Sequence, residues 1–286
     1  MKKIRPALYL KPLVLTVLLL SCGVGPSDTQ DRTPVIVKAL PSTPSQIWRP
    51  ALKTSWQWQL SDLPVDQSFD VAMYDIDMFD NDANVVAALH AQGRKVVCYV
   101  SVGSWEDWRP DQDQFPPSVI GKDYAGWPGE KWLDIRRIDL LAPIMRARFD
   151  QCQAKGFDAV EPDNIDGYTN DTGFPLTYQN QLNYNAWLAN EAHARGLSIG
   201  LKNDGDQAED LLAYFDWAMT EDCFADDWCD QVAPFVAAGK TVFAAEYMDQ
   251  LTSGQFFNQI CPQASTLNLN AILKNRDLDA YREACP

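Results

Sequence analysis

The sequence is poor in histidine and in basic residues, and both shortages exclude functions. Only two of the 286 residues are histidine, which excludes a site built on several histidines, such as three around zinc. Lysine and arginine together number 24 against 39 aspartate and glutamate residues, and the formal net charge is −15. A surface of that sign repels a polyanion, so we expect no nucleic-acid partner.

Other kinds of site are also missing. The chain carries no glycine-rich dinucleotide or phosphate-binding loop. Both histidines, His90 and His193, fall on helical segments that precede strands, so a Ser-His-Asp triad is not expected. The composition, 46% hydrophobic and 22% charged, is sufficient for a large folded core and excludes disorder of the whole chain.

The apolar run near the start, Pro12 to Leu20, is too short to cross a membrane comfortably. It follows four basic residues, which together with it predict a secretory signal over residues 1–21. The run ends in Leu19-Leu20-Ser21-Cys22-Gly23, which resembles the lipobox of bacterial lipoproteins. An ordinary signal peptide with a coincidental cysteine is the alternative.

This leader predicts where the protein resides. We expect lipidation of Cys22 and an exported protein anchored to the cell envelope, at the outer membrane, or released outside the cell. Residues 22–46 are rich in proline, serine and threonine without apolar periodicity, so they are predicted to form a flexible tether.

Six cysteines follow Cys22, and an even number in an exported chain predicts three disulfides. Short loops favour pairing Cys223 with Cys229 and Cys261 with Cys285. Cys98 with Cys152 then follows by elimination, with a pair of buried free thiols as the alternative.

Four places repeat one pattern, in which a helical segment ends in glycine and a β-rich apolar run follows at once. The glycines are Gly93, Gly156, Gly196 and Gly239. Glycine there suits the left-handed residue that closes a helix, and strands alternating with helices imply parallel pairing. The predicted strands are 95–100, 157–160, 197–201 and 241–245, with further runs at 71–77, 132–136, 217–221 and 267–273.

Eight such strands predict an α/β fold, a (β/α)8 TIM barrel formed as a single domain by residues 47–286. A doubly wound open sheet is the competing architecture. In a barrel, the acidic and amide residues that follow the strands converge on the face where active sites lie. Paired carboxylates with flanking aromatic residues are typical of glycoside hydrolysis. A Ca²⁺-binding rim is the alternative, although no EF-hand-like loop is present and we expect no metal.

Five segments carry a resemblance to a known family: 95–109, 156–168 (GFDAVEPDNIDGY), 200–203, 220–224 and 242–247. They resemble glycoside hydrolase family 114, whose characterised members are endo-α-1,4-polygalactosaminidases with a barrel fold. The resemblance runs from about residue 47 to the C-terminus. It implies that Asp163, after the fourth strand, and Glu221, after the sixth, are catalytic. We expect Asp163 to be the nucleophile and Glu221 the general acid/base, with Glu246 as the rival to Glu221 and no cofactor.

The remaining rim residues are expected to bind an amino-sugar polysaccharide. Carboxylates would pair with its ammonium groups: Asp75, Asp77, Glu106, Asp166 and Asp249. Aromatic rings would stack on sugars: Tyr74, Tyr99, Trp105 and Tyr247. Lys202 and Asn203 would hold hydroxyls or orient a catalytic carboxylate, and Asn164 and Glu246 complete the predicted set.

Three further residues have open or different roles. Trp56 and Trp58 alternate so that both indoles share a face, either at the rim or at the barrel bottom. Arg109 is expected to anchor a neighbouring carboxylate. The sequence thus predicts a monomeric, lipid-anchored endo-glycosidase. The alternatives are a glycosidase of the same fold with another glycan substrate, and a noncatalytic carbohydrate-binding lipoprotein.

Overall fold

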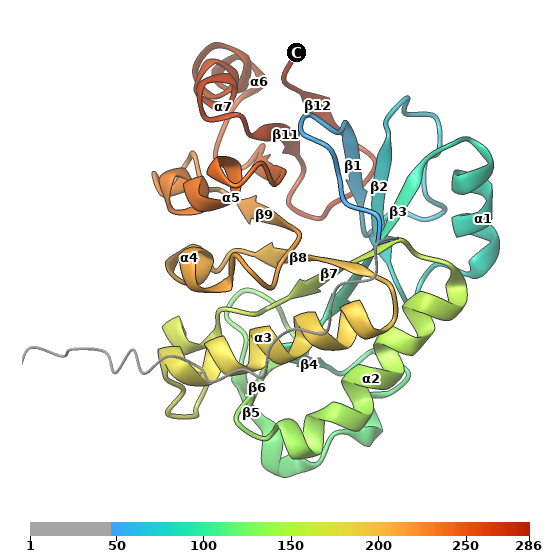
Figure 1. Ribbon diagram of the computed structural model, residues 1–286, viewed down its shortest axis with the longest axis vertical. Coiled ribbons are helices and arrows are strands. Elements are labelled where there is room, and N and C mark those ends of the chain that lie inside the picture. Colours follow the sequence, from blue (N-terminus) through green and yellow to red (C-terminus); the bar gives the residue numbers. More distant parts are fainter. Residues whose placement is uncertain (1–46) are drawn as a thin grey trace, which may run out of the picture. The chain divides into compact units, whose positions relative to one another are not determined.

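The structure is a computed structural model that describes residues 47–286. At its centre is a curled nine-stranded sheet (Figure 1). The predicted signal, the predicted tether and Cys22 lie outside the described residues.

Eight strands of the central sheet are parallel and follow one another in chain order. They are β1 (Trp56–Gln59), β2 (Met73–Asp77), β3 (Lys95–Ser101), β7 (Ala159–Asp163), β8 (Ser198–Lys202), β9 (Trp217–Glu221), β10 (Val242–Tyr247) and β11 (Asn270–Lys274). The short β12 (Glu283–Ala284) pairs antiparallel with β11. Sequential parallel strands of this kind form the α/β, TIM-barrel-like fold that the sequence predicts.

Side chains and the C-terminal segment join the two ends of this curled sheet. The Trp56 indole donates a hydrogen bond to the Asn270 carbonyl at 3.0 Å, and Arg282 Nε donates to the Trp56 carbonyl at 2.6 Å. Alternate residues along the strands therefore face an enclosed interior, where Trp56, Trp217 and Phe243 pack in one apolar cluster. A larger apolar cluster lies between the strands and the surrounding helices.

Seven α-helices connect the strands among the described residues. They are α1 (Ala83–Ala91), α2 (Ile138–Lys155), α3 (Tyr178–Ala194), α4 (Ala208–Leu211), α5 (Ala233–Ala237), α6 (Ser253–Gln255) and α7 (Cys261–Leu267). The predicted glycines Gly93, Gly156, Gly196 and Gly239 all have left-handed φ angles, between 73° and 90°, after helices. Between residues 47 and 286, no helix is both long and apolar enough to span a membrane.

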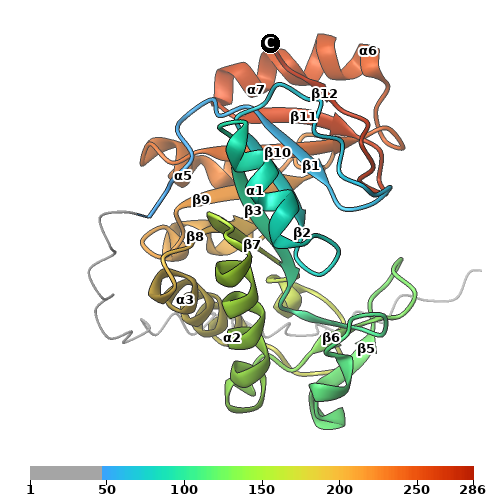
Figure 2. The same cartoon turned by 90° about the vertical axis from the view of Figure 1, so that its right-hand side faces the viewer.

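One predicted barrel strand, residues 132–136, is wrong. The strand observed there is β6 (Glu130–Leu133), which pairs antiparallel with β4 (Ser104–Glu106) and β5 (Ile120–Asp123) in a separate small sheet. Figure 2 shows β5 and β6 apart from the parallel strands. The eighth parallel strand of the central sheet is β1 instead.

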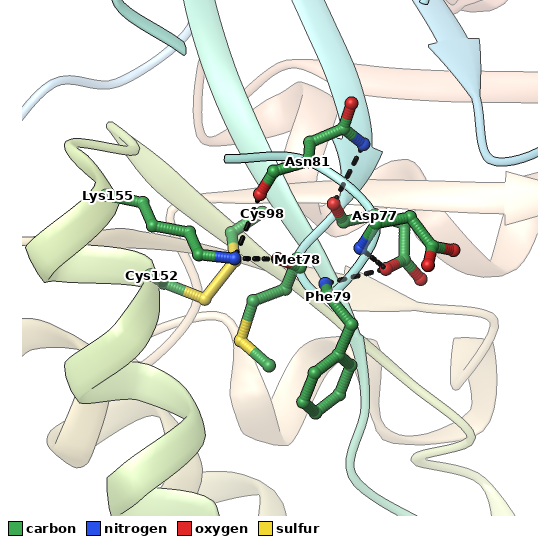
Figure 3. Close-up of a disulfide and its surroundings, with 8 residues drawn as sticks. Asp77, Met78, Phe79, Asn81, Cys98, Cys152 and Lys155 are labelled. Carbon is green, nitrogen blue, oxygen red and sulfur yellow. Dashed lines mark hydrogen bonds between the residues drawn. A yellow bond between two sulfur atoms is a disulfide. The ribbon is translucent and has the colours of Figure 1, made fainter. Parts of the chain in front are cut away.

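The three disulfides have the predicted pairing: Cys98–Cys152, Cys223–Cys229 and Cys261–Cys285. The first ties β3 to α2 (Figure 3). Beside it, Lys155 Nζ donates to the carbonyls of Met78 and Asn81, which fixes the loop after β2. Three disulfides suggest an extracytoplasmic protein.

Candidate active site

A cleft of about 470 Å³ opens at the carboxyl ends of the parallel strands. Residues from the ends of β2, β3, β7, β8 and β9 line it, together with residues of the small sheet. The predicted residues on its walls are Asp77, Tyr99, Glu106, Asp163, Asn164, Asp166, Lys202, Asn203 and Glu221. The strand ends therefore bring most of the predicted polar residues into one hollow, as the barrel prediction requires.

Lys202 is the centre of the charged contacts in this cleft. It ends β8, is almost fully buried, and its Nζ lies 2.8 Å from Glu161 Oε1, 3.0 Å from Asp163 Oδ1 and 3.0 Å from Glu221 Oε2. Burial alone would lower the pKa of Lys202, but these carboxylates reverse the effect and raise it well above its ordinary value. Lys202 is therefore a fixed cation beneath the two candidate catalytic carboxylates.

Each of these two carboxylates has further hydrogen-bond donors. The Tyr99 hydroxyl donates to Asp163 Oδ2 at 2.9 Å. Asn203 Nδ2 donates to Glu221 Oε2 at 2.9 Å, and the Tyr247 hydroxyl donates to Glu221 Oε1. The side chains of Asp163 and Glu221 keep 18% and 25% exposure, so both remain accessible from the cleft.

The shared contact with Lys202 limits the distance between the two carboxylates. Asp163 Oδ1 and Glu221 Oε2 are each 3.0 Å from the same nitrogen, so the two oxygens lie no more than about 6 Å apart. Retaining glycosidases place their carboxyl groups about 5–5.5 Å apart, whereas inverting ones leave about 6.5–9.5 Å. The upper limit of about 6 Å for these two oxygens lies below the inverting range and is compatible with the retaining one.

Burial and the hydrogen bonds act in opposite directions on Glu221. Burial raises its pKa, but the Lys202 ammonium and the donors Tyr247 and Asn203 outweigh burial and hold the pKa below the ordinary glutamate value. The carboxylate form of Glu221 is therefore favoured in the free site.

A left-handed residue follows each of three neighbouring strands at the cleft. Asn164, Asn203 and Asp222 have φ angles of 63°, 54° and 53° and come directly after Asp163, Lys202 and Glu221. Asparagine and aspartate tolerate this conformation better than other side chains except glycine. A Cβ on Gly103 would lie 1.6 Å from the Asn164 carbonyl oxygen, so glycine is needed where the chain crosses this turn.

A second charged group forms one wall of the cleft. Arg109 contacts Asp77 Oδ2 at 2.6 Å and Glu106 Oε1 at 2.8 Å, and all three side chains are buried. Asp77 also accepts hydrogen bonds from the backbone of Phe79 and Asp80, a turn that Figure 3 shows in part. Arg109 anchors neighbouring carboxylates, as the sequence predicts, and it also lines the cleft.

The small sheet contributes a third group through Glu130. Asn164 Nδ2 donates to Glu130 Oε1 at 2.8 Å, and the Ser104 hydroxyl donates to the same oxygen. Burial raises the pKa of Glu130 to about 7, with partial compensation from these donors. In the same cleft, burial and the charge of Asp163 raise the pKa of Asp166 to about 6.

Several predicted sugar-binding residues do not reach the cleft. Tyr74 is fully buried on the helix-facing side of β2 and donates to the carbonyls of Asp66 and Phe69, so its ring is not available for a sugar. Glu246 is equally buried, and its two oxygens accept the backbone N–H groups of Phe224 and Ala225. Glu246 therefore holds the loop after β9 and does not compete with Glu221 for the cleft.

Four other predicted sugar-binding residues also lie off the cleft lining. Two are engaged elsewhere: the Trp105 indole donates to the Gln112 carbonyl, and the exposed Asp249 pairs with Arg276. Asp75 and Tyr247 are fully buried beneath the cleft, so they act on neighbouring side chains and do not touch a sugar.

Sequence reasoning missed the aromatic wall of the cleft. Tyr124 and Trp127, from the loop between β5 and β6, line the cleft beside Trp108, and the two tryptophans are 47% and 51% exposed. The run Asp123 to Glu130 carries two aromatic residues among turn-forming glycines and a proline, and this was the available signal. Trp58 also lines the cleft, with its ring centroid 4.7 Å from Lys202 Nζ, which resolves its position in favour of the rim.

Two other kinds of catalytic site, a metal centre and a nucleophilic serine, can be checked against the described residues. Over residues 47–286, no group of three or more histidine, cysteine, aspartate or glutamate side chains is arranged to hold a metal ion. The run Gly196–Gly200 has the pattern Gly-x-Ser-x-Gly, but Ser198 is buried at the start of β8, four residues before Lys202 at the cleft.

With this geometry in place, comparison with known proteins gives the family. Residues 37–286 match the sequence profile of glycoside-hydrolase family GH114. The chain belongs to glycoside hydrolase family 114. It also resembles an uncharacterized protein of Deinococcus radiodurans at 30% identity over 213 residues, which is 65% of this chain and 66% of that protein.

Solved structures agree with this family. The crystal structure of Aspergillus fumigatus Ega3 in complex with galactosamine is 41% identical, has a TM-score of 0.81, and matches 86% of this chain and all of that one. The glycoside hydrolase domain of PelA from Pseudomonas aeruginosa is 13% identical, with a TM-score of 0.64 over 80% of this chain and 98% of that one. The likeness to PelA concerns the fold alone.

Proposed function

We propose that this family 114 protein is an endo-acting glycoside hydrolase that cleaves α-1,4-linked galactosamine-rich polysaccharide. The observation that carries the proposal is the placement of Asp163 and Glu221 on either side of Lys202 in an open acidic cleft. The 41% identity to Ega3, which was solved with galactosamine, supports the choice of sugar.

Asp163 is proposed as the nucleophile and Glu221 as the general acid/base. In the first step the Asp163 carboxylate attacks the anomeric carbon while Glu221 protonates the departing glycosidic oxygen. In the second step the Glu221 carboxylate takes a proton from water, whose oxygen displaces Asp163 from the anomeric carbon. The separation of at most about 6 Å between their nearest oxygens supports this double displacement.

The charge of the cleft supports a cationic sugar chain. Arg109 pairs with both Asp77 and Glu106, so its single positive charge offsets only one of these two negative charges. Asp80, Asp166 and Asp226 also line the cleft and add negative charge toward its opening. Ammonium groups of a galactosamine polymer would be attracted to this surface.

Export and anchoring belong to the proposal as well. The three disulfides are consistent with folding outside the cytoplasm. Lipidation of Cys22 would hold the enzyme at the cell envelope through the tether of residues 22–46, as a monomer. Palmitate labelling of the wild-type chain and of Cys22→Ala tests the anchor directly.

Product release tests the catalytic proposal. Mature protein is incubated with partly deacetylated α-1,4-linked galactosamine polymer and, separately, with chitosan, and oligosaccharides are measured by mass spectrometry. We expect cleavage of the first polymer only, reduced by about 10³-fold or more in Asp163→Asn and Glu221→Gln, because each neutral amide removes a reacting carboxyl. Glu246→Gln is the matched control and is expected to keep activity.

The other outcomes separate the alternatives. Cleavage of chitosan instead would retain the chemistry and change the glycan. Polymer binding without cleavage by the wild type would favour a carbohydrate-binding protein. Full activity of Glu221→Gln would remove Glu221 from its proposed role.

A further inference from the structure

Two more carboxyl groups lie inside the sheet beneath the cleft, and the proposed reaction does not use them. Asp75 is on β2 and Glu161 on β7, and both are fully buried. Their neighbours in the sheet interior are apolar side chains such as Met73, Val97 and Ala159. The two groups are thus isolated from water but adjacent to Lys202.

The hydrogen bonding of this pair requires a proton. Within residues 47–286, no residue outside this pair donates a hydrogen bond to either oxygen of Asp75 or to Oε2 of Glu161. The two carboxyl groups are nevertheless within hydrogen-bonding reach of each other. Two carboxylates are both acceptors, so a hydrogen bond between them exists only when one is protonated. Two adjacent buried negative charges would also suffer both desolvation and mutual repulsion.

The contacts indicate which group carries the proton. Glu161 Oε1 accepts a hydrogen bond from Lys202 Nζ at 2.8 Å, and this cation partly offsets the burial that raises the pKa of Glu161 to about 7. No such ion pair reaches Asp75 among the described side chains, and burial together with the charge of Glu161 raises the pKa of Asp75 well above its ordinary value. These contacts favour Asp75 as the protonated group and the otherwise unpaired Oε2 of Glu161 as its acceptor.

We propose that Asp75 and Glu161 share one proton and act as a positioning pair that holds Lys202 between Asp163 and Glu221. The role of Asp163 and Glu221 rests on the proposed function, whereas the shared proton does not. With both oxygens occupied, Glu161 fixes the lower side of the Lys202 ammonium. Loss of the proton would add a second anion below Lys202 and draw it away from the cleft.

The titratable groups around the pair come from five strands. Asp163 of β7 and Lys202 of β8 act directly on Asp75 and Glu161. Tyr99 of β3 lies near Glu161, while Glu221 of β9 and Tyr247 of β10 act through Lys202. Only Lys202 is a cation in this group, so its charge is shared among several acids.

Infrared spectroscopy of the substrate-free protein tests the proton without any enzymatic assay. A protonated carboxyl has a C=O stretching band distinct from that of a carboxylate. The difference spectrum between wild type and Asp75→Asn at pH 7 should show the loss of one such band. Asp139→Asn, which changes an exposed carboxylate paired with Arg137, is the matched control and should show none. An unchanged protonated-carboxyl region in Asp75→Asn would overturn the proposal.

Two substitutions of Asp75 test the positioning role. Asp75→Asn keeps an N–H donor for Glu161, so kcat and its pH profile should stay within about threefold of wild type. Asp75→Leu removes the donor, and Glu161 takes up a proton to remain buried. Lys202 then acts more strongly on Glu221 and lowers its pKa further. The falling limb of the pH profile of kcat/KM should therefore move about one pH unit lower. At a fixed pH on that limb, kcat/KM should fall about tenfold. KM should stay unchanged because Asp75 does not line the cleft.

The outcomes keep the two proposals apart. A lost infrared band with no polymer cleavage in wild type would overturn the proposed function and retain the shared proton. Polymer cleavage with no lost band would overturn the shared proton alone. Equal loss of kcat in Asp75→Asn and Asp75→Leu, with both variants folded by circular dichroism, would overturn the positioning role.

Discussion

At the scale of single residues, Lys202 determines the chemistry that its neighbours can perform. It contacts Glu161, Asp163 and Glu221, and it lowers the pKa of Glu221. In its proposed role as general acid, Glu221 must be protonated before it can donate, so its lowered pKa favours the proposed reaction in acidic solution.

This gives the first prediction, on pH. The protonated fraction of Glu221 decreases as pH rises through its lowered pKa. We therefore expect kcat/KM on the polymer to be highest at acidic pH and to fall toward neutral, by up to about tenfold per pH unit. The measurement is a pH series with soluble oligogalactosaminide.

An activated substrate provides the control for the same prediction. An oligogalactosaminide with a dinitrophenyl leaving group needs no proton from Glu221 in the first step. Its falling limb should therefore disappear or move to higher pH when that step limits the rate. Identical profiles for the two substrates would contradict the assignment of Glu221 as the acid.

Residue-level prediction from the sequence fails where neighbours on one strand compete. Glu246 and Tyr247 are adjacent on β10, and Tyr74 and Asp75 are adjacent on β2. Adjacent strand residues point to opposite faces, so at most one of each pair can point toward the cleft. Both faces of these strands are buried, so apolar periodicity gives no sign of which residue it is.

At the scale of elements, the small sheet forms a wall of the cleft that a minimal barrel does not have. It brings Tyr124, Trp127 and Glu130 to the cleft, and β4 leads to Trp108. The backbone N–H of Asp107 donates to the Gly129 carbonyl at 3.0 Å, which holds the two tryptophan-bearing segments together. Exposed tryptophans beside acidic groups suit a sugar chain that carries ammonium groups.

The second prediction concerns this wall. Trp127→Ala removes an exposed aromatic face at the cleft. A cation–π contact at an exposed site is worth about 0.5–1 kcal/mol, so we expect KM for long polymer to rise about two- to fivefold with kcat unchanged. Steady-state kinetics on polymers of defined length measure the effect.

Matched variants make the test specific. Trp127→Phe keeps an aromatic face and should recover most of the affinity. Phe257→Ala removes an exposed ring outside the cleft and should have no effect. An equal rise in KM for disaccharide and for polymer in Trp127→Ala would contradict the proposal that this wall binds sugar units away from the cleaved bond.

The sequence predicts the ends of several helices well, but it does not predict which sheet each strand joins. Glycines after helices mark Gly93, Gly156, Gly196 and Gly239, because few other residues adopt their φ angles without strain. Residues 130–133 do form a strand, but local alternation does not say which sheet a strand joins. That choice depends on pairing with the nearby β5 and with β4, which lies more than twenty residues earlier in the chain.

At the scale of the whole molecule, the parallel order of strands places the proposed catalytic groups. Figure 1 shows β7, β8 and β9 side by side, and their ends carry Asp163, Lys202 and Glu221 in turn. The cation therefore lies on the strand between the two acids, which sets their separation. Strand spacing was accessible from the sequence through the barrel prediction, but the bridging contact of Lys202 depends on side-chain geometry.

The stereochemistry of the first product tests this arrangement most directly. Fresh wild-type protein is mixed with α-linked galactosamine oligosaccharide in an NMR tube, and the anomeric protons of the new reducing end are followed before mutarotation. The separation between Asp163 and Glu221 predicts retention, so the α-anomer should appear first. Glu221→Gln should give no early product. Initial appearance of the β-anomer would contradict the double displacement and the roles assigned to this pair.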